Sequence, residues 1–222
     1  MKTQEITGQV IYDLATELYP IPRSLTGSGV RQTLKIIKRE LPDLSVYEIP
    51  SGTKVFDWEI PEEWNIRDAY IIGPDKNKIA DFKKNNLHVL GYSTPIKKTL
   101  SLDELEKNLH SLPDQPNAIP YITSYYKKRW GFCLAHNERK KLKPGNYQVY
   151  IDSTLEPGFL TYGELIIPST TGNKKEVLLS TNICHPSMGN NEVSGPSVTS
   201  ILAKWLTSLS HRAYTYRVVF LP

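Results

Sequence analysis

Residues 175–221 read KEVLLSTNICHPSMGNNEVSGPSVTSILAKWLTSLSHRAYTYRVVFL and alternate strand and helix signals. The run Val177 to Ile183 predicts a buried strand, the apolar periodicity from Gly195 to Leu209 predicts a helix, and Tyr214 to Leu221 predicts a second strand. A strand, a loop, a helix and a strand in this order are typical of a βαβ unit with parallel strands. The stretch therefore predicts an α/β fold.

Two amphipathic helices are expected near the N-terminus. Apolar residues recur at helical spacing from Val10 to Leu18 and from Val30 to Leu41, and prolines follow each run. Three further segments read as strands, namely Leu44 to Ile49, Tyr147 to Ile151 and Phe159 to Ile167. Residues 1–50 and 145–222 are therefore expected to build one α/β domain.

Residues 51–144, between these parts, differ in composition: they are rich in Pro, Trp and Tyr and contain many short apolar runs. Short strands are expected at Val55–Trp58, Ala69–Ile72 and Leu87–Leu90. One helix is expected after Ser101, where Glu104 completes a capping box; its apolar face would be Leu102, Leu105 and Leu109. The segment predicts an inserted β-rich domain with its own small core.

The composition favours a globular protein without a nucleic-acid or membrane function. Apolar residues make up 39% of the 222 residues, and the 27 basic residues, against 23 acidic ones, form no continuous basic stripe. Met1–Glu5 is polar, and every apolar run is too short to span a bilayer. Two cysteines, Cys133 and Cys184, are too few for a disulfide framework, so a cytoplasmic protein with reduced thiols is expected.

The candidate site lies between the predicted strand and helix of the C-terminal stretch, where His185, Asn191 and Glu192 follow each other closely. Ligands bind at this edge of open α/β sheets, and an imidazole with a carboxylate oxygen suits zinc or another divalent ion. Taken alone, the same residues also fit an ordinary loop, since Asn-Asn and Ser-Gly are common turn sequences. Ser194 is the expected N-cap of the helix, with Pro196 in its first turn.

Several short motifs occur from one end of the chain to the other. They are Arg23-Ser24-Leu25-Thr26-Gly27, Val55-Phe56-Asp57-Trp58, Ile119-Pro120-Tyr121, Thr123-Ser124-Tyr125-Tyr126, Trp130-Gly131-Phe132-Cys133, Tyr162-Gly163-Glu164 and Cys184-His185-Pro186-Ser187. With these motifs the chain resembles a bacterial family of aminopeptidase-like proteins associated with polysaccharide biosynthesis, related to the co-catalytic zinc aminopeptidases. The resemblance implies the N-terminal part of a three-layer aminopeptidase-like α/β fold that carries an inserted β-rich domain.

The resemblance also implies a site for one or two zinc ions. It makes His185 a metal ligand, puts Asn191 at the position that bridges two metals, and leaves Glu192 as a neighbouring carboxylate that can substitute as a ligand. Two departures weaken the implied site. Ser187 stands where the family has an Asp that orients the imidazole, and the neutral Asn191 stands where it has the bridging Asp.

The implied chemistry is metal-assisted hydrolysis of an amide bond in a small peptide, aminoacyl or amino-sugar substrate, in a surface-polysaccharide pathway. Zinc would lower the pKa of a bound water, and a Glu beyond Pro222 would be the general base. Because the chain stops directly after a buried-looking strand, we expect these residues to be a fragment that is inactive alone.

Other functions stay open at this stage. A non-catalytic relative could bind a sugar or amino-acyl ligand, with the aromatic residues Tyr121, Tyr125, Tyr126 and Trp130 as stacking surfaces. A Cys-His hydrolase could pair Cys133 with His185, and a homo-oligomer is compatible with the sequence.

Overall fold

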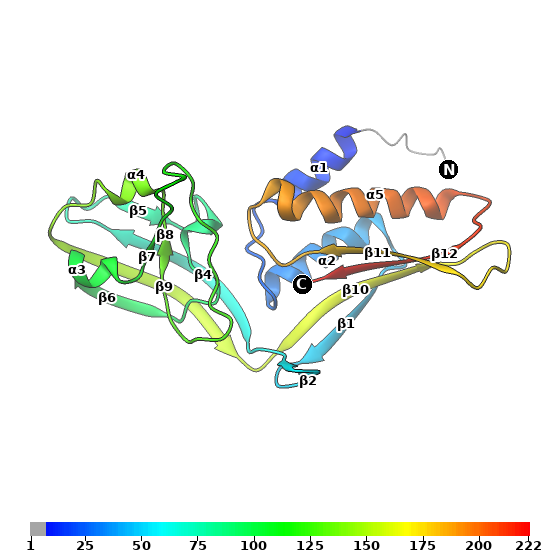
Figure 1. Cartoon of the computed structure of the whole chain (residues 1–222), viewed down its shortest axis with the longest axis horizontal. Coiled ribbons are helices and arrows are strands. Elements are labelled where there is room, and N and C mark those ends of the chain that lie inside the picture. Colours follow the sequence, from blue (N-terminus) through cyan, green and yellow to red (C-terminus); the bar gives the residue numbers. More distant parts are fainter. Residues whose placement is uncertain (1–7) are drawn as a thin grey trace. The chain divides into compact units, whose positions relative to one another are not determined.

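The computed structural model describes residues 8–222, which form two compact units (Figure 1). Of the described residues, the first unit contains 8–62 and 157–222, and the second contains Glu63–Glu156. The sequence places these divisions at 50/51 and 144/145 instead. The shift arises because strand β9 (Asn146–Glu156) pairs along its length with β4 (Glu63–Ile72) and so belongs to the second unit.

The first unit is built on a four-stranded sheet in the order β1 (Ser45–Pro50), β10 (Phe159–Ile167), β12 (Thr215–Leu221) and β11 (Glu176–Asn182). Strands β11 and β12 run parallel, and the helix α5 (Ser194–Ser208) connects them. The other neighbouring strands are antiparallel. The predicted βαβ unit is confirmed, and with it the α/β fold.

The helices α1 (Gly8–Leu18) and α2 (Ser28–Glu40) form as the apolar periodicity predicts. Helices α2 and α5 bury their apolar faces against β10 and β12, and Figure 1 shows both helices on one side of the sheet. The centre of this core contains Leu34, Ile37, Leu165, Ala203, Leu206, Val218 and Phe220. Helix α1 packs on the start of α5 through a second cluster, which contains Leu14, Leu18, Ile21, Val193 and Ile201. This second cluster holds the chain segment that follows β11.

The second unit is an antiparallel sheet in the order β5 (Lys78–Asp81), β4, β9 and β6 (Ile96–Ser101). Its helix α3 (Leu102–Glu106) begins with the predicted capping box, because the Ser101 N–H donates to Glu104 Oε2 at 2.8 Å and the Glu104 N–H donates to Ser101 Oγ at 3.4 Å. Leu109 lies outside that helix, in β7 (Leu109–His110), which pairs with β8 (Phe132–Cys133). A short helix α4 (His136–Arg139) completes the unit.

Two strand predictions are wrong. Val55–Trp58 is a hairpin, β2 (Lys54–Val55) and β3 (Trp58–Glu59), whose turn contains Phe56 at φ 56°. The predicted strand at Leu87–Leu90 begins as a single 3-10 turn, η1 (Asn86–His88), because the Asn85 side chain accepts the Leu87 N–H at 2.9 Å. Both errors come from local turn chemistry that apolar alternation does not reveal.

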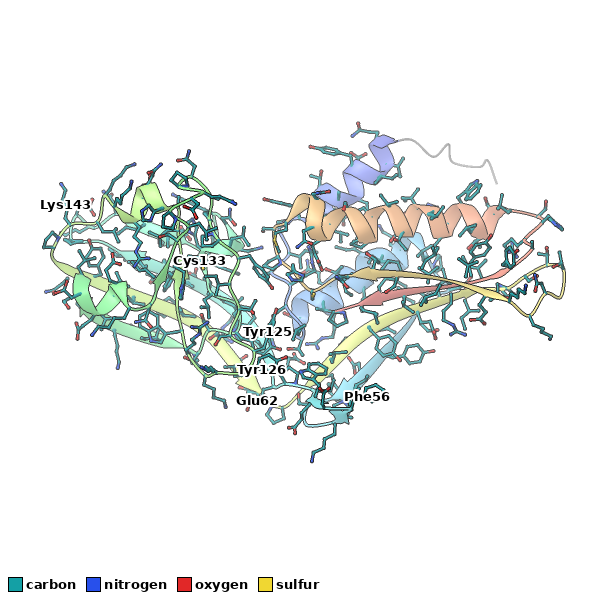
Figure 2. All side chains as sticks on the ribbon, viewed as in Figure 1. Phe56, Glu62, Tyr125, Tyr126, Cys133 and Lys143 are labelled. Atoms are coloured by element: carbon teal, nitrogen blue, oxygen red, sulfur yellow. The ribbon has the colours of Figure 1, made fainter. Side chains whose placement is uncertain are left out.

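Both cysteines are buried free thiols. Burial raises the pKa of Cys133 to about 12, so this thiol lacks the thiolate character that a Cys-His hydrolase needs. Figure 2 shows Cys133 within the second unit, together with Tyr125 and Tyr126 of the same unit. Across residues 8–222, none of the helices combines the length and the apolar content that crossing a bilayer requires.

Candidate functional site

The candidate site is the segment between the carboxyl end of β11 and helix α5. Residues 183–188 form a loop, which is followed by one π-helical turn, η2 (Gly189–Val193), that runs straight into α5. Ser194 is therefore not the N-cap: it lies inside continuous helical backbone, and its Oγ donates to the Asn190 carbonyl at 2.6 Å. Single π-helical turns are frequent at functional sites.

A close approach between α5 and β11 fixes this segment against the sheet. A Cβ atom on Gly195 would lie 2.3 Å from Thr181 Oγ1, far inside normal contact distance. A larger residue at position 195 would require the Thr181 side chain to move, so glycine suits the close approach of the first turn of α5 to the end of the strand. The π-helical turn that precedes it is thereby held close to the loop that carries His185.

Glu192 binds the backbone and the ring of His185 at the same time. Its Oε1 accepts the His185 N–H at 3.0 Å and also the Cys184 N–H, and its Oε2 lies 2.9 Å from His185 Nδ1. Glu192 is only 1% exposed, whereas the His185 side chain is a quarter exposed. A buried carboxylate thus fixes an imidazole that reaches the surface.

The protonation states in this cluster follow from burial and hydrogen bonding. Burial favours the neutral form of Glu192, but the hydrogen bonds from the His185 ring and from the two backbone N–H groups outweigh it and lower its pKa. An ionised carboxylate only accepts, so Nδ1 of His185 carries a proton that it donates to Glu192, and in the neutral ring the lone pair is then on Nε2. Burial, reinforced by the Glu192 charge, raises the pKa of the Cys184 thiol to about 12.

Arg23 holds the same loop from the other side. This arginine lies between α1 and α2 and is 1% exposed. Its Nε donates to the His185 carbonyl at 3.1 Å, and its Nη1 donates to the Leu18 carbonyl at 2.6 Å. Burial lowers the pKa of Arg23 to about 10, and the nearby Glu192 charge opposes that shift. The sequence contains the Arg23 motif but gave no signal for this role, which depends on a contact across 162 positions.

The remaining candidate residues lie differently from the sequence-based expectation. Asn191 is exposed, and its amide nitrogen lies 3.9 Å from Met188 Sδ. Ser187 has a left-handed φ of 44°, and its Oγ donates to the Tyr19 carbonyl at 3.3 Å. The expectation that His185 lacks an orienting carboxylate is wrong, since Glu192 supplies one in place of position 187.

The spacing of the donor atoms limits how well this cluster fits zinc. Cys184, His185 and Glu192 bring donor atoms within 4.8 Å of one another. However, Nδ1 and Oε2 are 2.9 Å apart, a hydrogen-bond distance, whereas two such ligands around a tetrahedral zinc lie about 3.3 Å apart. Among residues 8–222, this cluster therefore supplies one suitable zinc ligand, His185 through Nε2, and a complete site needs about three.

Three comparisons with known proteins bear on this arrangement. Residues 12–222 match a family model described as Domain of unknown function (DUF4910). A Clostridium acetobutylicum protein, named for polysaccharide biosynthesis and an aminopeptidase-like domain, is 50% identical over 97% of this chain. The chain spans about half the length of that relative, 49% of it.

Superposition on solved structures identifies the fold. A crystal structure described as a peptidase from Clostridium acetobutylicum superposes with a TM-score of 0.92 at 50% identity, over 97% of this chain and 50% of the other. An M28 peptidase precursor from Shewanella amazonensis (96% of this chain, 63% of the other) and the zinc aminopeptidase BSAP from Bacillus subtilis (99% and 62%) each superpose with a TM-score of 0.58 at 12% identity. The two distant structures establish the likeness in fold alone, and the predicted aminopeptidase-like fold is confirmed.

Proposed function

The chain belongs to the DUF4910 family and has an aminopeptidase-like fold, and from this premise we propose that the whole protein is a metal-dependent hydrolase of amide bonds. In this proposal, His185 contributes one zinc ligand, and further ligands come from parts of the whole protein that lie outside these 222 residues. The observation that carries the proposal is the hydrogen bonding between Glu192 and His185. Because Nδ1 donates to this carboxylate, Nε2 is the ring nitrogen that can present a lone pair to a metal.

The described residues have defined tasks in such a site. Glu192 selects the tautomer and the orientation of the His185 ring, since its buried carboxylate contacts both Nδ1 and the backbone N–H. Arg23 fixes the backbone on the other side. The partly exposed ring lies in the loop after the carboxyl end of β11, where open α/β sheets bind their ligands. A small peptide, aminoacyl or amino-sugar amide is the proposed substrate class.

A role in surface-polysaccharide biosynthesis is part of the proposal and rests on the name of the Clostridium acetobutylicum relative. The residues of the present chain alone are expected to be inactive, because one ligand does not hold a catalytic zinc.

The experiment that tests the function is a hydrolysis assay on the full-length protein. Aminoacyl-p-nitroanilides and N-acyl amino sugars would be offered with and without a chelator. We expect turnover that the chelator abolishes and added zinc restores, and a His185→Ala protein whose kcat/KM is lower by at least about a hundredfold. A matched control is His211→Ala, which removes an imidazole from the exposed loop after α5.

Chelator-resistant turnover, or equal activity in His185→Ala, would contradict the proposal. Absence of any turnover in a zinc-loaded protein would instead favour the non-catalytic binder. In that event Tyr126, which is 81% exposed, is the first residue to test for sugar stacking, as Tyr126→Ala.

A further inference from the structure

Arg23 is an unusual component of the first unit, because a charged side chain is almost entirely buried there. Its guanidinium makes hydrogen bonds to two backbone carbonyls, those of Leu18 and His185, and its Nη2 has no hydrogen-bond partner among residues 8–222. Burying a charge is costly, and an apolar side chain of similar volume is often at least as stabilising at such a place. Stability alone therefore does not explain an arginine here.

The contacts of Arg23 point to the placement of His185. Helix α1 ends at Leu18, whose carbonyl accepts from Arg23 Nη1 at 2.6 Å and from the Ile21 N–H at 3.3 Å. Arg23 joins this fixed carbonyl to the carbonyl of His185, 162 positions away. A guanidinium can do this because its donors are held in one rigid plane.

His185 is consequently held at three places. Its carbonyl accepts from Arg23, its N–H donates to Glu192 Oε1, and its ring Nδ1 donates to Glu192 Oε2. If the carbonyl were released, the His185–Pro186 peptide could rotate, and the backbone at His185, which places the N–H and the ring against Glu192, would be less well fixed. The Arg23 charge also lies near the buried Glu192 carboxylate, which it favours electrostatically.

We propose that Arg23 is a positioning residue that fixes the direction of the His185 imidazole by anchoring its main-chain carbonyl to the end of helix α1. The inference rests on the proposed function for its purpose, but the anchoring itself is a property of residues 8–222. Arg23 is not expected to touch a substrate, because it is 1% exposed.

The test uses the full-length protein, stripped of metal with a chelator, in three variants. Arg23→Met removes the donors and keeps much of the volume, and Arg23→Lys keeps the charge but not the planar pair of donors. Arg39→Met is the matched control, because it removes a guanidinium that pairs with Glu17 on the exposed surface of α2. Hydrogen–deuterium exchange is followed peptide by peptide, and the ring nitrogens of His185 are followed by NMR.

We expect the amides of residues 183–188 to exchange about tenfold faster in Arg23→Met, the factor for the loss of one charge-assisted hydrogen bond. Peptides from β10 and β12 should be unchanged, Arg23→Lys should be intermediate, and Arg39→Met should match the wild type. The His185 ring should change from a single Nδ1–H tautomer to a mixture in Arg23→Met.

Unchanged exchange at 183–188, or equal acceleration throughout the first unit, would overturn the proposal. If Arg23→Met does not fold, Arg23→Lys decides the matter, since wild-type exchange and a single tautomer in that variant would also overturn it. Because these readouts need no metal, their failure refutes the role of Arg23 and leaves the hydrolase proposal to its own assay.

Discussion

Substitution of Glu192 by alanine is expected to lower the free energy of unfolding by about 4 kcal/mol. The Glu192 carboxylate accepts from two backbone N–H groups and one imidazole, and it is 1% exposed. Alanine leaves those three donors without their acceptor and removes a charge that balances the buried Arg23. Urea unfolding of the full-length protein, followed by circular dichroism, would measure the change.

Glu192→Gln is the matched variant. Its amide oxygen can still accept from the Cys184 and His185 N–H groups, and its amide nitrogen can donate to His185 Nδ1 if the ring proton moves to Nε2. We therefore expect a smaller loss of stability, but a loss of zinc affinity of about 10–100-fold, because Nε2 no longer presents a lone pair. Equal stability of Glu192→Ala and wild type would refute the described hydrogen-bond network.

Gly29→Ala is expected to destabilise the first unit although alanine is the better helix former. A Cβ atom at Gly29 would lie 2.4 Å from the Pro22 carbonyl oxygen and 3.2 Å from the Arg23 Cα. Both atoms are main chain, so the clash cannot be relieved by a side-chain rotation. Overpacking of this kind costs about 3 kcal/mol, against about 1 kcal/mol gained in helix propensity, which leaves a net loss of about 2 kcal/mol.

Gly8→Ala provides the control for this substitution. Gly8 is also helical, in α1, and apart from its chain neighbours and its own helix backbone, no atom of the described residues lies within 4 Å of the position that a Cβ atom would occupy there. We expect that variant to equal or slightly exceed the wild type in stability. If Gly29→Ala behaves like Gly8→Ala in urea unfolding, the tight contact between α2 and the segment at Pro22 is not present in solution.

Periodic patterns predicted most of the first unit. The apolar stripes of α1, α2 and α5 and the runs of β10, β11 and β12 are long enough to give a clear signal, and all six elements form. The turn at Phe56 and the capped turn at Asn85 were missed, because each depends on one backbone conformation or one side-chain hydrogen bond within a short apolar run.

The sequence predicts where in the chain the candidate site lies, but not how its side chains are arranged. Its position follows from the strand, loop and helix pattern around His185. The roles of neighbouring residues do not follow, since the π-helical turn Gly189–Val193 decides that Glu192 is buried beside His185 while Asn191 is exposed. The role of Arg23 could not be predicted either, because its partner His185 lies 162 positions further along the chain.

The proposal that His185 is a zinc ligand is tested most directly by elemental mass spectrometry of the full-length protein, with His185→Ala and His211→Ala prepared in parallel. We expect stoichiometric zinc in the wild type and in His211→Ala, and a loss of at least one zinc ion per protein in His185→Ala. Equal zinc in all three proteins, or none in any of them after reconstitution, would contradict the assignment of His185 as a ligand.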